Sequence, residues 1–167
     1  QQYNVPVIGI TGSNGKTIVK EWLYQLLQHD YNIVRSPRSY NSQVGVPLSV
    51  WQMNGSNTLA IFEAGISEPG EMQRLQQVIA PTIGILTNIG EAHSEGFTNP
   101  TEKINEKLKL FVQCNVLIYN ADNPATNEVL HTFVNNSETN KHVRLFSWGK
   151  TATATLQIMD VVSNDAQ

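Results

Sequence analysis

Seven residues near the start of the chain have the types and the order needed to bind phosphate groups. They read Thr-Gly-Ser-Asn-Gly-Lys-Thr at positions 11–17, after an apolar run and before a helical pattern. Gly12 and Gly15 allow backbone conformations closed to other residues, so successive N–H groups can point at phosphate oxygens. The following helix adds the free N–H groups and the positive end of its first turn. Lys16 supplies mobile charge for the outer phosphates of ATP, and the Thr17 hydroxyl is a ligand for Mg²⁺.

The segment departs in one respect from the general phosphate-loop pattern G-x-x-x-x-G-K-[ST]. The slot for its first glycine falls on Ile10, and glycines stand instead at positions 9 and 12. An ordinary turn can also contain Gly-Lys-Thr, but the flanking strand and helix patterns favour a nucleotide site. The predicted nucleotide-binding residues are Gly12, Ser13, Asn14, Gly15, Lys16, Thr17 and Ile18.

Two further polar groups each lie after an apolar run that predicts a β-strand. We expect them at the same edge of the sheet as the loop 11–17. Glu63 comes directly after the run at 58–62, where a carboxylate can hold Mg²⁺ opposite a phosphate-loop hydroxyl. A helix-capping or solvated acid is the alternative. His93 lies in the long polar loop 87–97; a hydrogen-bonded structural histidine is the alternative to a ligand.

Lys107 and the loop 36–45 are less obvious candidates. Lys107 borders a predicted apolar helical stripe, where a lysine ordinarily covers apolar surface with its stem and keeps its ammonium in water. The loop contains hydroxyl and amide side chains after the second predicted strand. It is either a connection or a substrate contact.

The elements that must position these groups alternate between strand and helix. Strands are predicted at 5–10, 31–35, 58–62, 82–87, 115–119 and 142–147, with a weaker one at 155–162. Helices are predicted at 17–28, 45–53, 70–79, 100–112 and 124–134. This order predicts an α/β fold with three layers, in which a mostly parallel sheet has helices on both faces. Ligands then bind beyond the carboxyl ends of the strands.

Composition narrows the class of protein. With 167 residues, of which 40% are hydrophobic, the chain 1–167 is predicted to be one domain. The net charge of −3 and the lack of a basic cluster argue against a nucleic-acid partner. No apolar run reaches the roughly 20 residues of a membrane helix, and the lone Cys114 fits a reducing cytoplasm. The start at Gln1 without Met suggests a piece of a longer polypeptide.

Four segments together resemble the central ATPase domain of the Mur ligases, a family with a fold like that of the P-loop NTPases. The similarity covers nearly the whole chain, and its Asn-x-x-x-Gly-Val-Pro loop favours the branch that adds D-Ala-D-Ala. The four segments are 11–17, 40–48, 61–65, and 87–97 with the following 106–111.

The resemblance implies roles for individual residues. Thr17 and Glu63 would bind one Mg²⁺, and His93 would help to bind a second. Lys107 would be carbamylated, so that it presents oxygen ligands instead of an ammonium, although the family's Lys-Gly-Glu is Lys-Leu-Lys here. Catalytic roles fall to Lys16, His93 and Lys107, and substrate contacts to Asn41, Ser42 and Gln43.

The resemblance also implies a reaction. Mur ligases are bacterial cytoplasmic enzymes that build the peptide of peptidoglycan by ATP-dependent amide-bond formation. In the favoured branch the carboxylate of UDP-MurNAc-tripeptide becomes an acyl phosphate, which the amine of D-Ala-D-Ala attacks. The N-terminal UDP-binding domain and the C-terminal domain of such ligases have no counterpart in this sequence. We therefore expect the chain alone to lack ligase activity and to bind ATP weakly.

Two other functions remain open at this level. Folylpolyglutamate synthase shares the architecture and the acyl-phosphate chemistry, but its loop tends to have a lysine where Asn14 stands and a serine after Gly-Lys. A regulatory module that only senses or hydrolyses ATP would leave the joint presence of Glu63, His93 and Lys107 as coincidence.

Overall fold

The computed structural model describes residues 4–90, 97, 99–135 and 140–162. Within these residues seven strands form one sheet, in the order β2-β3-β1-β4-β5-β6-β7, and all neighbouring pairs are parallel. The predicted α/β class is thus confirmed. The strands are β1 (Val7–Thr11), β2 (Ile33–Arg35), β3 (Leu59–Glu63), β4 (Ile83–Leu86), β5 (Val116–Asn120), β6 (Arg144–Gly149) and β7 (Leu156–Gln157).

Helices connect the strands at the predicted places. Asn99 starts one of them, because its side chain accepts a hydrogen bond from the Glu102 N–H at a helix whose first turn contains Pro100. The predicted helix 100–112 is shorter and ends in a 3₁₀ turn, and the weak strand 155–162 shrinks to two residues. The helices are α1 (Lys16–Leu27), α2 (Gly45–Val50), α3 (Glu71–Ile79), α4 (Pro100–Leu108), the 3₁₀ turn η1 (Lys109–Phe111) and α5 (Pro124–Asn135).

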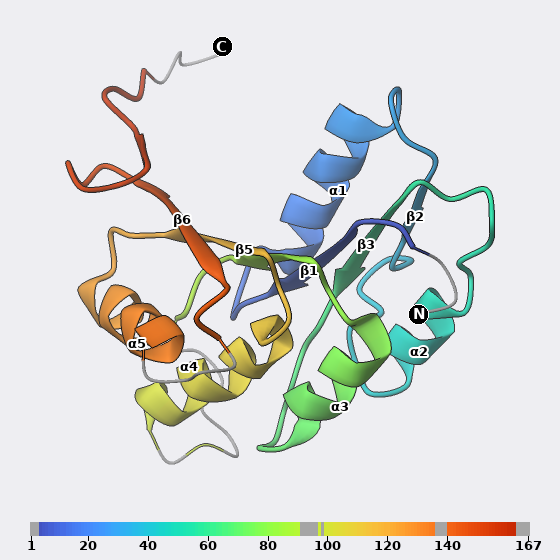
Figure 1. The fold of residues 1–167 in the computed structure, drawn as a ribbon, viewed down its shortest axis with the longest axis horizontal. Coiled ribbons are helices and arrows are strands. Elements are labelled where there is room, and N and C mark those ends of the chain that lie inside the picture. The colour runs from blue at the N-terminus through green and yellow to red at the C-terminus, as the bar shows by residue number, and fades with distance from the viewer. Residues whose placement is uncertain (1–3, 91–96, 98, 136–139, 163–167) are drawn as a thin grey trace, which may run out of the picture.

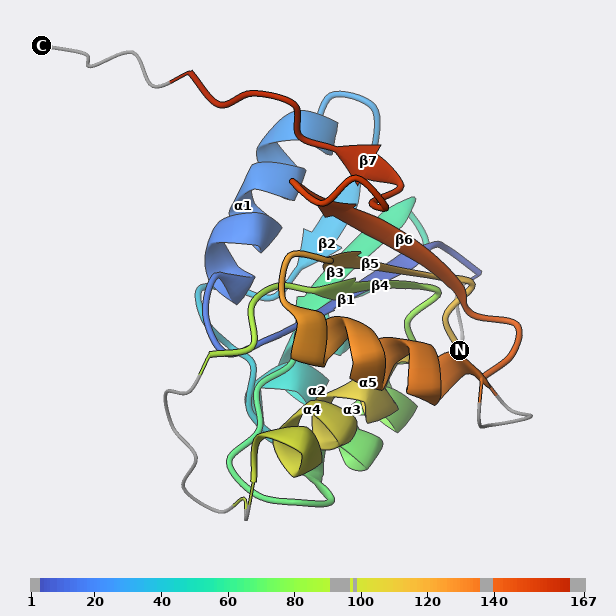
Figure 2. The ribbon, with the colours of Figure 1, turned by 90° about the vertical axis from the view of Figure 1, so that its left-hand side faces the viewer.

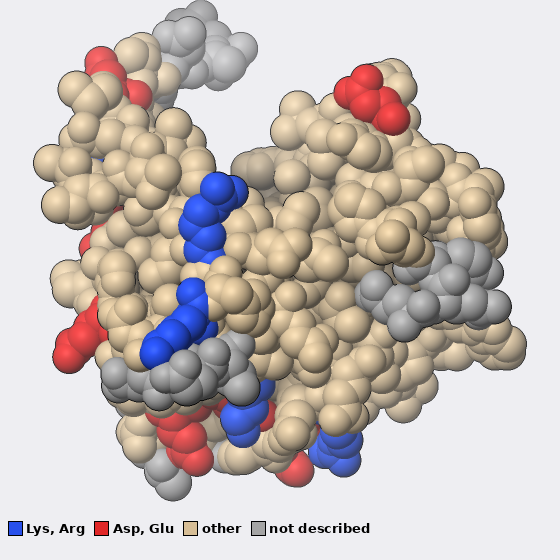
Figure 3. Space-filling model, in the orientation of Figure 1, with Lys and Arg blue, Asp and Glu red and all other residues tan. Residues whose placement is uncertain are grey.

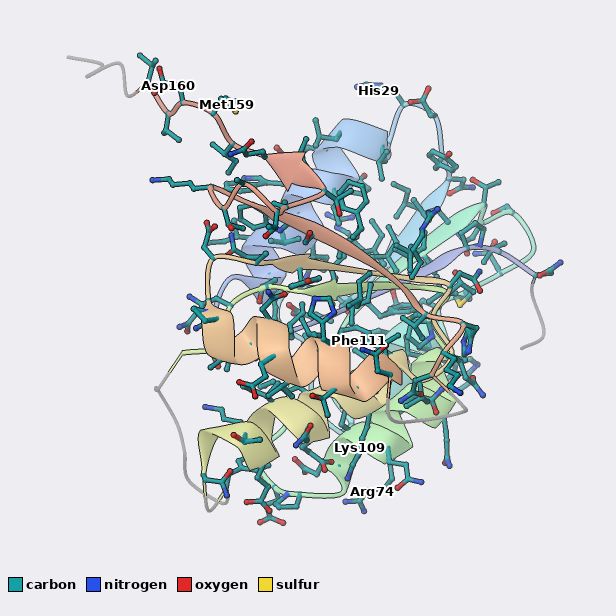
Figure 4. The ribbon with its side chains drawn as sticks, turned by 60° about the vertical axis from the view of Figure 1, so that its left-hand side comes forward. His29, Arg74, Lys109, Phe111, Met159 and Asp160 are labelled. Carbon is teal, nitrogen blue, oxygen red and sulfur yellow. The ribbon has the colours of Figure 1, made fainter. Side chains whose placement is uncertain are left out.

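The helices divide unevenly between the two faces of the sheet. In Figures 1 and 2 α1 lies on one face, whereas α2, α3, α4 and α5 lie on the other. Alternate residues of β1 point to the two sides: Val7 joins the larger core under the four helices, and Ile8 and Ile10 join the smaller core under α1. Phe111 fixes η1 to the sheet at Gly84, where an added Cβ would lie 2.5 Å from the ring (Figure 4).

The strand order contains a switch point at β1, because the chain continues from β1 to strands on one side of it and later to strands on its other side. β1 lies between β3 and β4, so the loops after β1, β3 and β4 meet at the same edge. In parallel sheets such a switch point is where ligands bind. The segments predicted to carry chemistry therefore converge.

Helix α4 is attached to α3 by a buried carboxylate. Glu106 Oε1 accepts hydrogen bonds from the N–H groups of Gly70 (2.7 Å) and Met72 (3.3 Å) at the start of α3, and Lys109 pairs with its other oxygen. The side chains of Lys109 and Arg74 lie on the outer side of the helical layer (Figure 4). This attachment fixes the rotation of α4 and hence the direction of Lys107.

None of the described helices combines the length and apolarity that crossing a membrane requires. On the face drawn in Figure 3 the Lys and Arg side chains are few and separate, and the lower ones lie near Asp and Glu side chains.

Candidate functional site

The loop after β1 requires glycine at two positions. Gly12 has φ of +151° and Gly15 has φ of +83°, a region that other residues rarely adopt. A Cβ on Gly12 would lie 2.0 Å from Thr87 Oγ1 and 3.1 Å from the backbone of Asn88. The backbone can therefore approach β4 only because Gly12 has no side chain.

The exit of β4 holds the loop in place. Ser13 N–H donates to the carbonyl oxygen of Asn88 over 2.6 Å, and Thr87 Oγ1 donates to the carbonyl oxygen of Asn14 over 2.6 Å. These bonds order the segment 12–15 before any ligand arrives. Ile18, the last predicted nucleotide contact, is exposed on the first turn of α1.

Lys16 lies back over its own loop. Its Nζ donates to the carbonyl oxygens of Gly12 (2.9 Å) and Ser13 (3.2 Å). Burial lowers the pKa of Lys16, Glu63 opposes this effect, and the charge of Lys103 adds to it. The ammonium is thus positioned above the glycine loop, where the phosphates of a nucleotide would lie.

Thr17 and Glu63 place two side-chain oxygen atoms next to each other. Thr17 Oγ1 donates to Glu63 Oε2 over 2.9 Å, and Glu63 is fully buried at the end of β3. Its Oε1 has no hydrogen-bond partner among the described residues; Lys20 Nζ lies 3.7 Å away. A buried carboxylate oxygen without a hydrogen-bond donor, beside a hydroxyl, fits a hard cation such as Mg²⁺. His93 lies in 91–96, outside the described residues. Within the part of the chain that the structure describes, no group of three His, Cys, Asp or Glu side chains could hold a metal ion.

Lys107 reaches the same loop from α4. Its side chain is only 3% exposed, and its Nζ donates to the carbonyl oxygen of Gly12 over 3.3 Å. The alternative interpretation, in which Lys107 keeps its ammonium in water, is therefore wrong for the described structure. Burial, then the charges of Lys16 and Lys103, lower the pKa of Lys107 from 10.5 to about 8.

The predicted substrate residues lie at the same edge but already have partners. The carbonyl oxygen of Asn41 accepts from Gly65 N–H (2.7 Å), just after Glu63. Ser42 Oγ accepts from the first N–H of α2, and Gln43 Nε2 donates to a carbonyl oxygen of α3. These contacts attach the loop to three elements and place it beside the candidate metal ligands.

A pocket of about 1190 Å³ extends from the phosphate loop across the less covered face of the sheet. It begins at Asn14 and Gly15 and runs between α1 and the strands β4 and β5. Its far end has a polar rim after β5, which includes Asn120 and Asn123, and the indole of Trp148. The pocket combines apolar walls with a few convergent polar groups, as small-molecule sites do.

Comparison with known proteins identifies the family. Residues 10–166, nearly the whole chain, match the model of the Mur ligase middle domain. The chain belongs to the Mur ligase family.

Two relatives in the Mur ligase family have the same name. The chain is 43% identical over 103 residues to the UDP-N-acetylmuramoyl-tripeptide--D-alanyl-D-alanine ligase of Borreliella burgdorferi, covering 62% of this chain and 22% of the relative. It is 35% identical over 155 residues to the ligase of the same name from Rickettsia prowazekii, covering 91% and 34%. The chain thus spans between a fifth and about a third of these relatives.

A solved structure agrees with the fold. The MurF ligase of Thermotoga maritima in complex with ADP is 26% identical and superposes with a TM-score of 0.75 over 89% of this chain and 34% of that one. This relative of the Mur ligase domain was solved with a nucleotide bound.

Sequence reasoning missed three features of this Mur ligase domain. Lys103 is buried on α4 one turn before Lys107, and the i, i+4 spacing was the available signal. The polar residues after β5 were also overlooked, although Asn-Ala-Asp-Asn at 120–123 follows a predicted strand at the correct edge. Lys20 is fully buried, which nothing in the helical pattern indicated.

Proposed function

We propose that this domain binds ATP and Mg²⁺ and is the phosphate-activating centre of a D-Ala-D-Ala-adding ligase. The observation that carries the proposal is the Glu63 carboxylate. It is buried next to Thr17 at the glycine loop, and one of its oxygens has no hydrogen-bond donor among the described residues. A buried carboxylate oxygen costs free energy in a folded chain unless a direct contact completes it, and Lys20 Nζ, at 3.7 Å, is too far away to donate a hydrogen bond.

The residues of the site divide the work by charge and position. ATP would supply the phosphoryl group that turns a substrate carboxylate into an acyl phosphate, and Mg²⁺ would neutralise the charge. The N–H groups of the loop 12–15 and the start of α1 would hold the phosphates, while Lys16 follows the outer one. Catalysis would rest on fixed dipoles and charges, with no covalent bond to the protein.

Carbamylation of Lys107 is part of the proposal. A pKa of about 8 leaves about a tenth of the side chain as neutral amine at pH 7. The amine nitrogen attacks CO₂ and loses a proton, which gives a carbamate anion. The change replaces repulsion from Lys16 and Lys103 by attraction, and it supplies oxygen ligands for a second Mg²⁺ together with His93.

The complete ligase reaction also requires the two substrates that are joined, UDP-MurNAc-tripeptide and D-Ala-D-Ala. We propose that UDP-MurNAc-tripeptide approaches over Asn41, Ser42 and Gln43, which lie beside Glu63. Binding of the UDP group and of D-Ala-D-Ala is assigned to regions that the longer relatives have in addition. The proposal implies a bacterial cytoplasmic enzyme. It is favoured over folylpolyglutamate synthase because both sequence relatives are named as D-Ala-D-Ala ligases.

Calorimetric titration with ADP, with and without Mg²⁺, tests the proposal. We expect binding that Mg²⁺ strengthens, and we expect Glu63→Gln to weaken the Mg²⁺-dependent part by about tenfold or more. Glu128→Gln, an exposed change on α5, is the matched control and should bind like the wild type. Equal Mg²⁺ dependence in the wild type and Glu63→Gln would contradict the metal site.

The ligase activity needs its own assay. Phosphate release should require UDP-MurNAc-tripeptide and D-Ala-D-Ala in a protein that also contains the additional regions of the relatives. Phosphate release that is independent of both acceptors would favour an ATP-hydrolysing regulatory module instead.

A further inference from the structure

Lys20 is a fully buried lysine one turn after Lys16 on α1. Lysine is almost never fully buried unless its charge is paired. Its Nζ donates to the carbonyl oxygens of Ser36 (2.8 Å) and Arg38, and it lies 3.3 Å from Glu21 Oε1. The ammonium thus has a complete set of oxygen neighbours without any contact to water.

The same ammonium faces the candidate metal ligand. Lys20 Nζ is 3.7 Å from Glu63 Oε1, too far for a hydrogen bond but close enough for a strong Coulomb attraction in a buried site. The other carboxylate oxygen is held by Thr17. Lys20 is therefore the cation nearest to the oxygen that a metal ion would use.

The ammonium cannot easily move away when another cation arrives. Ser36 is fully buried, its hydroxyl accepts from Glu63 N–H over 3.2 Å, and its carbonyl oxygen holds Lys20. Arg38, which provides the second carbonyl, has φ of +49° and turns the chain back toward α1. The charge of Lys20 is thus a fixed part of the site.

We propose that Lys20 is a positioning residue that acts as a stand-in cation: it compensates Glu63 when no metal is bound and limits the affinity of the site for divalent ions. The inference rests on the proposed metal site at Glu63. Two effects oppose each other when Lys20 loses its charge, since repulsion of the metal ends while the turn 36–38 loosens. The charge effect dominates, because β3 and Thr17 still hold Glu63.

This arrangement has a consequence for the order of binding. A divalent ion alone meets the repulsion of Lys20, whereas an ion that arrives with a nucleotide brings negative phosphate charge that offsets it. The site would therefore take up its metal together with the nucleotide and release it when the phosphates leave.

Titration of the nucleotide-free protein with Mn²⁺, followed by the electron paramagnetic resonance signal of the free ion, tests the inference. We expect Lys20→Gln, and the nearly isosteric Lys20→Met, to lower the Kd for Mn²⁺ by about tenfold or more. Lys150→Gln removes the same charge from an exposed position and should leave the Kd unchanged. Circular dichroism selects the Lys20 variant that is folded.

A double variant separates this inference from the metal site itself. Adding Glu63→Gln to Lys20→Gln should abolish the gain in affinity. If the Lys20 variants bind Mn²⁺ no more tightly than the wild type while Glu63→Gln removes binding, the inference is overturned and the metal site stands. If none of the proteins binds Mn²⁺ without nucleotide, the inference about Lys20 is overturned, and the Mg²⁺ dependence of ADP binding still decides whether the metal site stands.

Discussion

Lys107 is a residue whose charge the fold opposes. It is buried on α4 near Lys16 and Lys103, and its pKa of about 8 lies well below the ordinary 10.5. Below pH 8 both the folded and the unfolded chain keep the proton, so the full cost of the buried charge lowers stability. Between pH 8 and 10.5 Lys107 loses its proton in the folded chain but keeps it in the unfolded chain, so the free energy of unfolding rises with pH. A shift of this size corresponds to about 3 kcal/mol.

Replacing Lys107 should therefore stabilise the domain while it removes the amine that we propose to be carbamylated. We expect Lys107→Met to raise the free energy of unfolding at pH 7 by up to about 3 kcal/mol, and the gain to disappear by pH 10.5. Urea unfolding in CO₂-free buffer across this pH range measures the effect. Lys150→Met, at an exposed position, should change stability by less than about 0.5 kcal/mol. A loss of stability at pH 7 in Lys107→Met would contradict the assignment.

Gly12 should tolerate no side chain. Gly12→Ala would create a contact of 2.0 Å with Thr87 as well as backbone strain, so we expect a loss of about 2 to 3 kcal/mol in stability and much weaker ADP binding. Gly70→Ala is the matched control, because φ is +85° but nothing lies within 4 Å of the added Cβ. It should cost about 1 kcal/mol and leave ADP binding intact. Normal ADP affinity in Gly12→Ala would argue against the loop as the phosphate site.

At the scale of elements, a few side chains attach one helix to the next and thereby orient the residues of the candidate site. Glu106 joins α4 to α3 through the N–H groups of Gly70 and Met72, and Lys107 is its neighbour in sequence. Two successive residues of α4 thus serve different purposes: one anchors the helix, and the other reaches the phosphate loop.

Removing the Glu106 carboxylate should lower the free energy of unfolding substantially. Glu106→Ala leaves the buried N–H of Met72 and the N–H of Gly70, the N-cap of α3, without an acceptor, and we expect a loss of about 2 to 3 kcal/mol in the free energy of unfolding. Glu128→Ala, an exposed change on α5, should cost less than about 0.5 kcal/mol. Hydrogen exchange provides a second measurement, since the amides of Gly70 and Met72 should exchange faster. Unchanged protection of both amides would show that Glu106 does not hold α3.

The sequence predicted the elements better than the side-chain directions within them. The apolar periodicity of 17–28 follows from local geometry, so α1 was predicted within one residue of its bounds. Whether Lys20 points inward depends on Ser36 and Arg38, which reach it only through the fold of β2. The inward rotation of Lys107 likewise depends on α3. Tertiary contacts of this kind leave no periodic signal in the sequence.

At the scale of the whole molecule, the uneven covering of the sheet determines where a ligand has room. Helix α1 stands alone on one face of the sheet (Figure 2). On that face the strands β4 and β5 line a pocket that continues the phosphate loop. The opposite face is filled by the larger core. A ligand that extends from the phosphate loop therefore has room on the α1 side of the described structure.

Trp148 should report nucleotide binding. It lines the pocket, whereas Trp22 and Trp51 are largely exposed. In a variant with Trp22→Phe and Trp51→Phe, we expect Mg²⁺ and ADP to change the fluorescence of Trp148 with the affinity found by calorimetry. Binding by calorimetry without any change in Trp148 emission would show that the nucleotide lies elsewhere.

The hydrogen bond from Lys107 to Gly12 joins residues 95 positions apart in the chain. Contacts of such separation form late in folding, because a long stretch of chain must lose its freedom before they can be made. A partly folded chain would have the glycine loop but neither Glu63 nor Lys107 beside it. A nucleotide would then bind only the fully folded protein. Its binding would slow unfolding and leave the folding rate unchanged.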